Sequence, residues 1–319
     1  MALPTYASPL EKAWHYTYLT ICAAIFVFLI APIVIVIPLS FNAEPYFTFT
    51  EKMLTFDPEG YSLRWYDKLV TFGMQAPEAE RGSSFWLDFW NNATWLQVAK
   101  NSVIIGVAAT LLSTTLGTIA ALGLTRPEMP YRKQIMAVLI SPMIVPIIIS
   151  ATGMFFFYSW MRVPMISFEG GLHIEMSRLA GSYLGIIMAH AALGIPFVII
   201  TVTATLSGFD QSLVRAAASL GANPRTTFFK VVMPLIMPGV VSGGLFAFVT
   251  SFDEVVAVLF IANADQQTIP RQMWNGIREQ ISPAILSVAT LLVLVSILLL
   301  TTVELLRRRS ERLRGLSPR

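Results

Sequence analysis

The sequence predicts an all-α protein, a polytopic bundle of helices that crosses a membrane about six times. Hydrophobic residues make up 55% of the 319 residues and charged residues only 13%, about half the charge of an ordinary soluble domain. Long apolar stretches, each free of charge over most of its length, recur along the chain. A transmembrane helix needs about 20 such residues. The strands of a β-barrel would instead alternate apolar and polar residues, and no such alternation occurs in the sequence.

Six stretches are long enough to span a bilayer. They are residues 18–39, 101–124, 135–161, 179–207, 235–262 and 281–306. Small residues are frequent in the second stretch, which predicts that it packs inside the bundle, because small side chains let helices approach closely. Pro142 and Pro146 are expected to kink the third stretch and Pro196 the fourth, since proline removes a backbone donor from a helix.

The pattern divides the chain into four parts. Residues 1–39 are expected to form an N-terminal tail and an uncleaved anchor, whose apolar run is longer than that of a signal peptide. Residues 40–94 form an extracytoplasmic segment rich in aromatic residues, some expected at the headgroup level and others in a small cap. Residues 95–306 form the transmembrane core, and residues 307–319 form a basic tail.

Basic residues collect on one side of the predicted bundle. Arg126, Arg132 and Lys133 lie between the second and third stretches, and six arginines lie in residues 307–319. The segment 40–94 carries four basic residues against eight acids. Because loops rich in Lys and Arg stay in the cytoplasm, both termini are expected there.

Residue types argue against several other classes of protein. The single cysteine, Cys22, and three widely separated histidines give no metal-ligand spacing, so no metal site is expected on this chain. A formal charge of +3 is too small to indicate binding to nucleic acid. The motifs Gly-x-Ser-x-Gly, His-Glu-x-x-His and the Gly-Lys-Ser/Thr P-loop do not occur, which argues against an enzyme.

Residues 211–234, between the fourth and fifth stretches, predict a helix, a turn and a second helix. The Ala-rich part 213–220 is expected to be a short helix that Gly221 ends. A turn follows at 223–224, and the second helix is expected to end at Pro234. By composition alone this is an ordinary amphipathic loop, although a rigid helix pair at the membrane surface is also an object that another protein can grip.

The spacing in this segment resembles the cytoplasmic signature of binding-protein-dependent ABC transport permeases. That signature reads Glu-Ala-Ala, three residues, Gly, nine residues and then Ile-x-Leu-Pro. Ala216 and Ala217 match the alanines, Gly221 follows after three residues, and Pro234 closes the motif. Arg215 stands where the family usually has glutamate, which preserves the docking shape but not the charge. The resemblance implies that these five residues couple the chain to an ATPase.

The resemblance extends over about residues 95–303 and implies a subunit of an importer in a bacterial inner membrane. Two permease subunits, usually different, form the path, and an extracytoplasmic solute-binding protein delivers the solute. The resemblance implies no cofactor on this chain itself, because two separate ATPase subunits, which dock onto the signature helices, hold ATP and Mg²⁺. The remaining partner is membrane lipid, with no nucleic acid involved.

Within that family the spermidine/putrescine-type permeases are the most similar branch. The segments that support this are residues 46–49, 61–66, 101–102 and 251–256. A permease for another small solute (amino-acid-like, an opine or an anion) and an ion-driven secondary transporter stay open as alternatives.

Two acids, Asp253 and Glu254, interrupt the fifth stretch. They follow Pro234 by 19 and 20 residues, which is about 28–30 Å along a helix and places them towards the outer half of the membrane. An ionisable group there is costly unless it faces water or a partner. One interpretation is that an acid lines the path of a cationic solute. The alternatives are that an acid snorkels, caps a helix break or pairs with a base such as Lys100.

Overall fold

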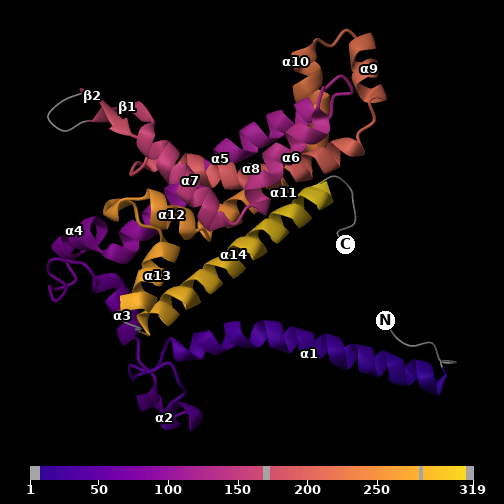
Figure 1. The fold of residues 1–319 in the computed structure, drawn as a ribbon. Helices are drawn as coiled ribbons and strands as arrows, with labels where there is room; N and C mark the ends of the chain where they lie inside the picture. The colour runs from indigo at the N-terminus through magenta and orange to yellow at the C-terminus, as the bar shows by residue number, and fades with distance from the viewer. Residues whose placement is uncertain (1–7, 168–172, 280–282, 314–319) are drawn as a thin grey trace. The chain divides into compact units, whose positions relative to one another are not determined.

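Helices dominate the computed structural model, which describes residues 8–167, 173–279 and 283–313 (Figure 1). The chain forms two compact units. One, called here the N/C unit, contains Met1–Ala93 and Gly276–Arg319, and the other, called the central unit, contains Thr94–Asn275.

The N/C unit contains two long helices, α1 (Pro9–Leu39) and α14 (Ala284–Leu313), which contact each other. Ser8 caps α1 through a reciprocal pair of hydrogen bonds with Glu11. Apolar side chains are exposed along nearly the whole of α1, among them Phe26 and Phe28. Such a surface is costly in water and suits a helix whose solvent is lipid.

Residues 40–92 of the N/C unit form a small cap at the end of α1. Its helices are α2 (Glu51–Leu54), η1 (Pro58–Gly60), α3 (Arg64–Thr71) and α4 (Ser83–Asn92). The indole of Trp65 is buried and donates to the carbonyl oxygen of Asn42 at 2.8 Å. The hydroxyls of Ser40 and Tyr66 lie 2.7 Å apart, and Ser287 of α14 donates to the carbonyl oxygen of Ser40 at 3.3 Å. The cap is therefore bonded directly to the ends of both long helices.

The central unit is built around three helices that pack on one another, α5 (Thr94–Leu124), α8 (Tyr183–Ser207) and α11 (Met233–Phe252). The buried face of α5 includes Gly106, Ala109, Ser113 and Gly117, which confirms the prediction that small residues place this stretch inside the bundle. The other elements of this part are α6 (Arg132–Ile144), α7 (Ile147–Trp160), β1 (Arg162–Ser167), β2 (His173–Arg178), α9 (Ser212–Ser219), α10 (Pro224–Thr227), η2 (Phe228–Val232), α12 (Val256–Ile261), η3 (Ala264–Gln266) and the start of α13 (Ile269–Glu279).

Helices long and apolar enough to cross a membrane confirm the all-α polytopic bundle. Among the described residues they are Pro9–Leu39, Thr94–Leu124, Tyr183–Ser207 and Pro224–Phe252. The pair α6 and α7, bent by 104°, would add a fifth if it is one span. The described apolar part of α14, Ala284–Leu298, is shorter. Residues 281–282 of the predicted sixth stretch and 314–319 of the basic tail lie outside the described residues.

The third stretch differs from its prediction, because it is two helices rather than one kinked helix. The break falls at Val145, whose backbone is extended (ψ 135°) and which precedes Pro146. A residue before proline is forced out of the helical region, and proline itself cannot donate to the helix. Pro142, by contrast, lies inside α6, and Pro196 lies inside α8. An antiparallel hairpin of β1 and β2, which the sequence did not predict, follows α7.

Candidate functional site: the docking segment and the Asn101 polar site

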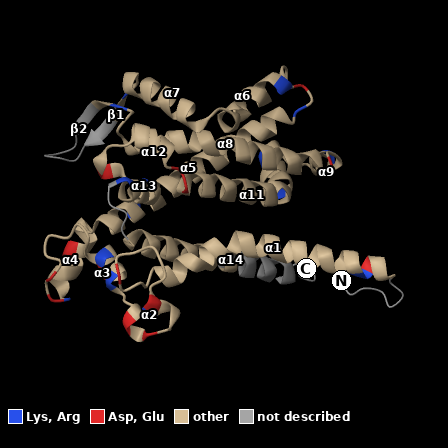
Figure 2. Cartoon of the chain, turned by 60° about the horizontal axis from the view of Figure 1, so that its bottom comes forward, with Lys and Arg blue, Asp and Glu red and all other residues tan. Residues whose placement is uncertain are grey.

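The docking segment, residues 211–234, has the predicted order of helix, turn and helix. It lies at one end of the central unit. The turn between α5 and α6 lies at the same end (Figures 1 and 2). The second helix departs from the prediction, because Pro234 does not end it. α10 runs through the π-helix η2 into α11, and Pro234 lies in the first turn of α11. The wider π turn accommodates a residue that has no N–H to donate.

Both ends of α9 are fixed by hydrogen bonds within the segment. At its start, Asp210 accepts from the hydroxyl of Ser212 and, at 2.8 Å, from its backbone N–H. These bonds, the hydroxyl bond first, hold the pKa of Asp210 below its usual range. At its end, the N–H groups of Gly221 and Ala222 return to the carbonyls of Ala218 and Ala217 at 2.9 and 3.0 Å. This is a Schellman motif, and it uses the positive φ of 83° that Gly221 adopts.

The turn after Gly221 is fixed in the same way. The side chain of Asn223 accepts from the backbone N–H of Thr226 at 2.8 Å and so caps α10, in which Pro224 takes the first position. Pro224 suits that position because its fixed φ matches the helix and no donor is lost there. The α9–α10 pair is therefore a rigid shape rather than a loose loop.

The surface of the docking segment is apolar with a basic edge. Leu220 is 88% exposed and Phe229 67% exposed, and Leu213 is also exposed. Of the predicted coupling residues, Ala217 is buried. The others, Arg215, Ala216, Gly221 and Pro234, are exposed.

The two acids of the fifth stretch lie at a break between helices, so that stretch is not one continuous helix. α11 ends at Phe252 and α12 begins at Val256. Glu254 is only 7% exposed, and its Oε1 atom accepts the backbone N–H of Ala257 at 2.9 Å. Asp253 is exposed. The acids therefore have different surroundings, and Glu254 matches the alternative in which an acid caps a helix break.

A group of polar side chains, among them the buried Asn101 and Ser102 and here called the Asn101 polar site, joins the chain after α12 to the starts of α5 and α8. The amide nitrogen of Asn101 donates to the carbonyl oxygens of Asp265 and Gln267, both at 2.9 Å. The Tyr183 hydroxyl donates to the Asn101 side-chain oxygen at 2.8 Å. Ser102 accepts the backbone N–H of Ile269 at 2.8 Å. In the sequence, the one signal for these bonds was the adjacent polar pair Asn101 and Ser102 at the start of the apolar stretch 101–124.

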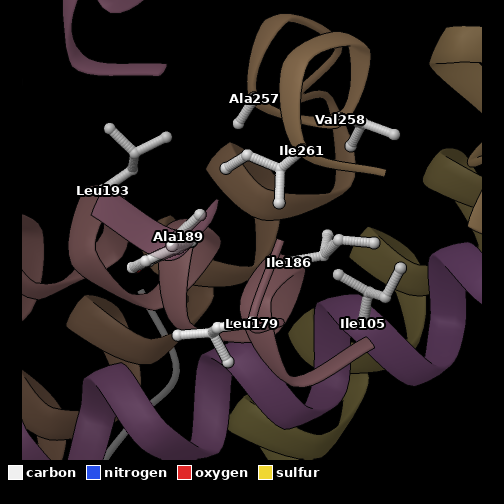
Figure 3. Close-up of a cluster of buried hydrophobic side chains, with 9 residues drawn as sticks. Ile105, Leu179, Ile186, Ala189, Leu193, Ala257, Val258 and Ile261 are labelled. Atoms are coloured by element: carbon white, nitrogen blue, oxygen red, sulfur yellow. The ribbon is translucent and has the colours of Figure 1, made fainter. Parts of the chain in front are cut away.

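The same site holds α12 against α8. The carbonyl oxygen of Gly181 accepts from Asn263 at 3.0 Å and from Gln266 at 2.7 Å. Arg271 donates to the carbonyl oxygens at the end of α12, Val258 at 3.1 Å and Ala262 at 3.0 Å. Apolar side chains complete the contact in a buried cluster (Figure 3). Its labelled members are Ile105, Leu179, Ile186, Ala189, Leu193, Ala257, Val258 and Ile261.

A buried hydrogen bond also joins α8 to α11, because Nδ1 of His190 lies 2.8 Å from the hydroxyl of Ser251. The histidine is thus a partner between helices. Among the described residues, no group of three or more His, Cys, Asp or Glu side chains could hold a metal ion.

Comparison with known proteins shows which family the chain belongs to. Residues 113–313 match the family described as "Binding-protein-dependent transport system inner membrane component". The chain is similar to the spermidine/putrescine transport system permease protein PotC of Haemophilus influenzae, with 26% identity over 90% of this chain and 95% of that protein. Against PotC of Escherichia coli K12 the identity is 24% over 89% of this chain and 91% of the relative. The putrescine transport system permease protein PotI of the same strain is 26% identical over 84% of this chain and 82% of its own length.

The family match takes in the docking segment and most of the central unit. It covers more than half of the 319 residues. The chain therefore belongs to the binding-protein-dependent transport system inner membrane components, as a multi-pass permease subunit of an ABC transporter whose ATP is hydrolysed by a separate subunit.

Proposed function

We propose that this chain forms half of the translocation path of an importer for polyamines of the spermidine and putrescine type. The observation that carries the proposal is the similarity to permeases named for these solutes over 84–90% of the chain. The exposed carboxylate of Asp253, at a break between two helices of the fifth stretch, supports the same substrate class.

The chemistry of a polyamine suits an acid in a path that contains little water. Two unit charges 4 Å apart attract each other by roughly 4 kcal/mol at an effective dielectric constant of 20. Desolvation offsets most of this attraction, which leaves a net gain of about 1–2 kcal/mol, or about five- to thirtyfold in affinity. Asp253 is the acid assigned to this role, because the carboxylate of Glu254 already caps α12.

The docking segment is proposed to bind a separate ATPase through its apolar tip and basic edge. Leu213, Leu220 and Phe229 offer exposed apolar side chains. The docking segment contains three cations, Arg215, Arg225 and Lys230, and the acid Asp210 directly precedes it. The partner surface is therefore expected to be an apolar groove with an acidic rim, in which an acid faces Arg215. Two ATPase subunits, a second and different permease subunit and an extracytoplasmic solute-binding protein complete the proposed importer.

The proposed orientation places both termini and the docking segment in the cytoplasm. Arg126, Arg132 and Lys133 flank the turn between α5 and α6, at the same end of the central unit as α9 (Figure 2). Basic loops stay on the cytoplasmic side. The proposed parts are then an anchor at 1–39, an extracytoplasmic segment at 40–94, a core at 95–306 and a cytoplasmic tail at 307–319.

One experiment on the purified complex tests this function. The tagged chain is expected to bring along ATPase subunits and a second permease, and vesicles that contain the complex should take up labelled putrescine or spermidine only with receptor and ATP. Uptake of an amino acid or an anion in place of a polyamine would reject the substrate but keep the permease. Uptake driven by an ion gradient in the absence of ATPases would reject the coupling.

A further inference from the structure

We propose that α4 is an amphipathic helix that lies in the lipid–water interface and holds the cap against the membrane. Three apolar side chains form one face of this helix: Trp86, Leu87 and Trp90 are 54%, 66% and 60% exposed. At about 100° per residue they lie within an arc of roughly 100°. On the other side of the helix, Phe85 is buried and Asp88 is half-buried.

Hydrogen bonds fix which face of α4 points out. The carboxylate of Asp88 accepts the backbone N–H groups of Gln75 at 3.3 Å and Ala76 at 2.9 Å, and the side-chain amide of Asn92 at 2.7 Å. These bonds lower the pKa of Asp88, and the bond from the Ala76 N–H has the largest effect. The Asp88 carboxylate therefore stays ionised at neutral pH. Turning the apolar face inward would break these bonds and expose Phe85.

The cap that carries α4 lies where α1 leaves the membrane. Ser40 follows the last residue of α1 and is bonded to Tyr66 of α3. An ion pair at 2.7 Å between Arg81 and Asp67 then ties the chain before α4 to α3. On the other side of α4, the single residue Ala93 separates it from α5, another helix long and apolar enough to cross a membrane. In the chain, the cap and α4 are therefore flanked by two helices long and apolar enough to cross a membrane, α1 before them and α5 after them.

Lipid is the partner that this arrangement favours. Tryptophan is enriched at membrane interfaces, where its ring is apolar and its N–H reaches water. A helix in the interface plane turns such side chains towards the acyl boundary and keeps its polar face in water. The short chain that joins α4 to a helix long and apolar enough to cross a membrane favours lipid headgroups as the partner of this face.

Spin labels on the complete transporter in nanodiscs of phosphatidylethanolamine and phosphatidylglycerol test the proposal. In a Cys22→Ser background, Leu87→Cys places a nitroxide on the apolar face, and Ser84→Cys places one at an exposed polar position of the same helix. We expect the label at 87 to be relaxed severalfold more by oxygen than by a water-soluble nickel chelate, and the label at 84 to show the reverse order. Equal access of the chelate to both labels would overturn the proposal. So would a label at 87 that loses water access only when the solute-binding protein is added, because the face would then be a protein dock.

A second measurement does not depend on a label. Brominated acyl chains should quench part of the tryptophan fluorescence of the unmodified chain, and the quenched fraction should fall in the Trp86→Phe/Trp90→Phe double variant. Phenylalanine keeps the face apolar, so the cap is expected to stay folded. An unchanged quenched fraction in the double variant would also overturn the proposal.

Discussion

The Oε1 atom of Glu254 lies 2.9 Å from the backbone nitrogen of Ala257 and accepts its hydrogen bond, so a buried acid caps α12. Asp253, its neighbour in the sequence, is exposed at the end of α11. Two adjacent acids in one apolar stretch therefore have different surroundings. Replacing each acid in turn separates a structural acid from an acid of the proposed path.

Replacing Glu254 tests the structural role. In Glu254→Ala the N–H of Ala257 loses its acceptor, and the loss of such a cap costs about 0.5–2 kcal/mol. Glu254→Gln keeps an oxygen at the same reach and is expected to retain most of the stability. The measurement is the thermal midpoint of the purified complex, which should fall for the alanine variant. Equal midpoints for both variants would show that the cap contributes nothing measurable.

Replacing Asp253 tests the path. Asp253→Asn removes one charge at constant volume, and we expect the half-saturating concentration of a polyamine to rise about five- to thirtyfold, for a loss of about 1–2 kcal/mol. Basal ATPase activity and assembly should be unchanged, because the side chain is exposed. Uptake at the original affinity by this variant would remove the electrostatic support for the polyamine assignment.

Substitutions at Gly221 test the role of the docking segment, because they change only the backbone conformation that this residue can adopt. Its φ is 83°, and no atom lies within 4 Å of the place where a Cβ would stand, so a substitution strains the backbone without a clash. A left-handed conformation costs an L-residue roughly 1–2 kcal/mol, while asparagine tolerates it best. Gly221→Val is expected to lose solute-stimulated ATP hydrolysis while remaining inserted. The matched control Gly221→Asn should keep most of it, and the reverse order of the two variants would contradict the proposed coupling.

Cysteine accessibility tests the orientation. In the Cys22→Ser background, Glu51→Cys on α2 and Glu128→Cys between α5 and α6 both stand at exposed positions. A maleimide that cannot cross membranes should label position 51 in intact cells, and position 128 only after permeabilisation. Labelling of position 128 from outside would reverse the proposed topology.

Hydropathy and local turn chemistry predict much of this fold because they depend on residues near in sequence. A long apolar run has few alternatives to a helix in lipid, and the Schellman end of α9 needs only Gly221 and its neighbours. The same locality explains the break at Val145, although its sharpness exceeds the expected kink. The helix, turn and helix that the sequence predicts at 211–234 therefore agree with the structure, except that Pro234 does not end the second helix.

Features that depend on distant partners could not be predicted in this way. Asn101 bonds to the carbonyl oxygens of Asp265 and Gln267, which lie 164 and 166 positions further along the chain. The separate surroundings of Asp253 and Glu254 arise from the break between α11 and α12. The two acids made a helix break one of several alternatives, but hydropathy could not choose among them, because apolar residues continue on both sides.

The contact between α8 and α11 supplies the last prediction. A Cβ built on Gly243 of α11 would lie 2.8 Å from the backbone Cα of Val198 and also against the hydroxyl of Thr201. Since a backbone atom cannot rotate away, Gly243→Ala must push the two helices apart, and overpacking of this kind typically costs about 1–3 kcal/mol. Close approach at small residues is also what stabilises helix pairs in lipid, where burial of apolar surface gives little net gain.

Gly153 of α7 provides the matched control, because no atom lies within 4 Å of a Cβ built there. In a helix, alanine is favoured over glycine by about 0.5–1 kcal/mol, so Gly153→Ala is expected to be neutral or slightly stabilising. Heating each variant and measuring the fraction that elutes as intact complex should give a lower midpoint for Gly243→Ala than for the unmodified chain, with Gly153→Ala at or above it. If Gly243→Ala has the same thermal midpoint as the unmodified chain, α8 and α11 can separate at no cost in free energy. The stability of the central unit would then rest on other contacts, such as the Asn101 polar site, rather than on the close approach of these helices.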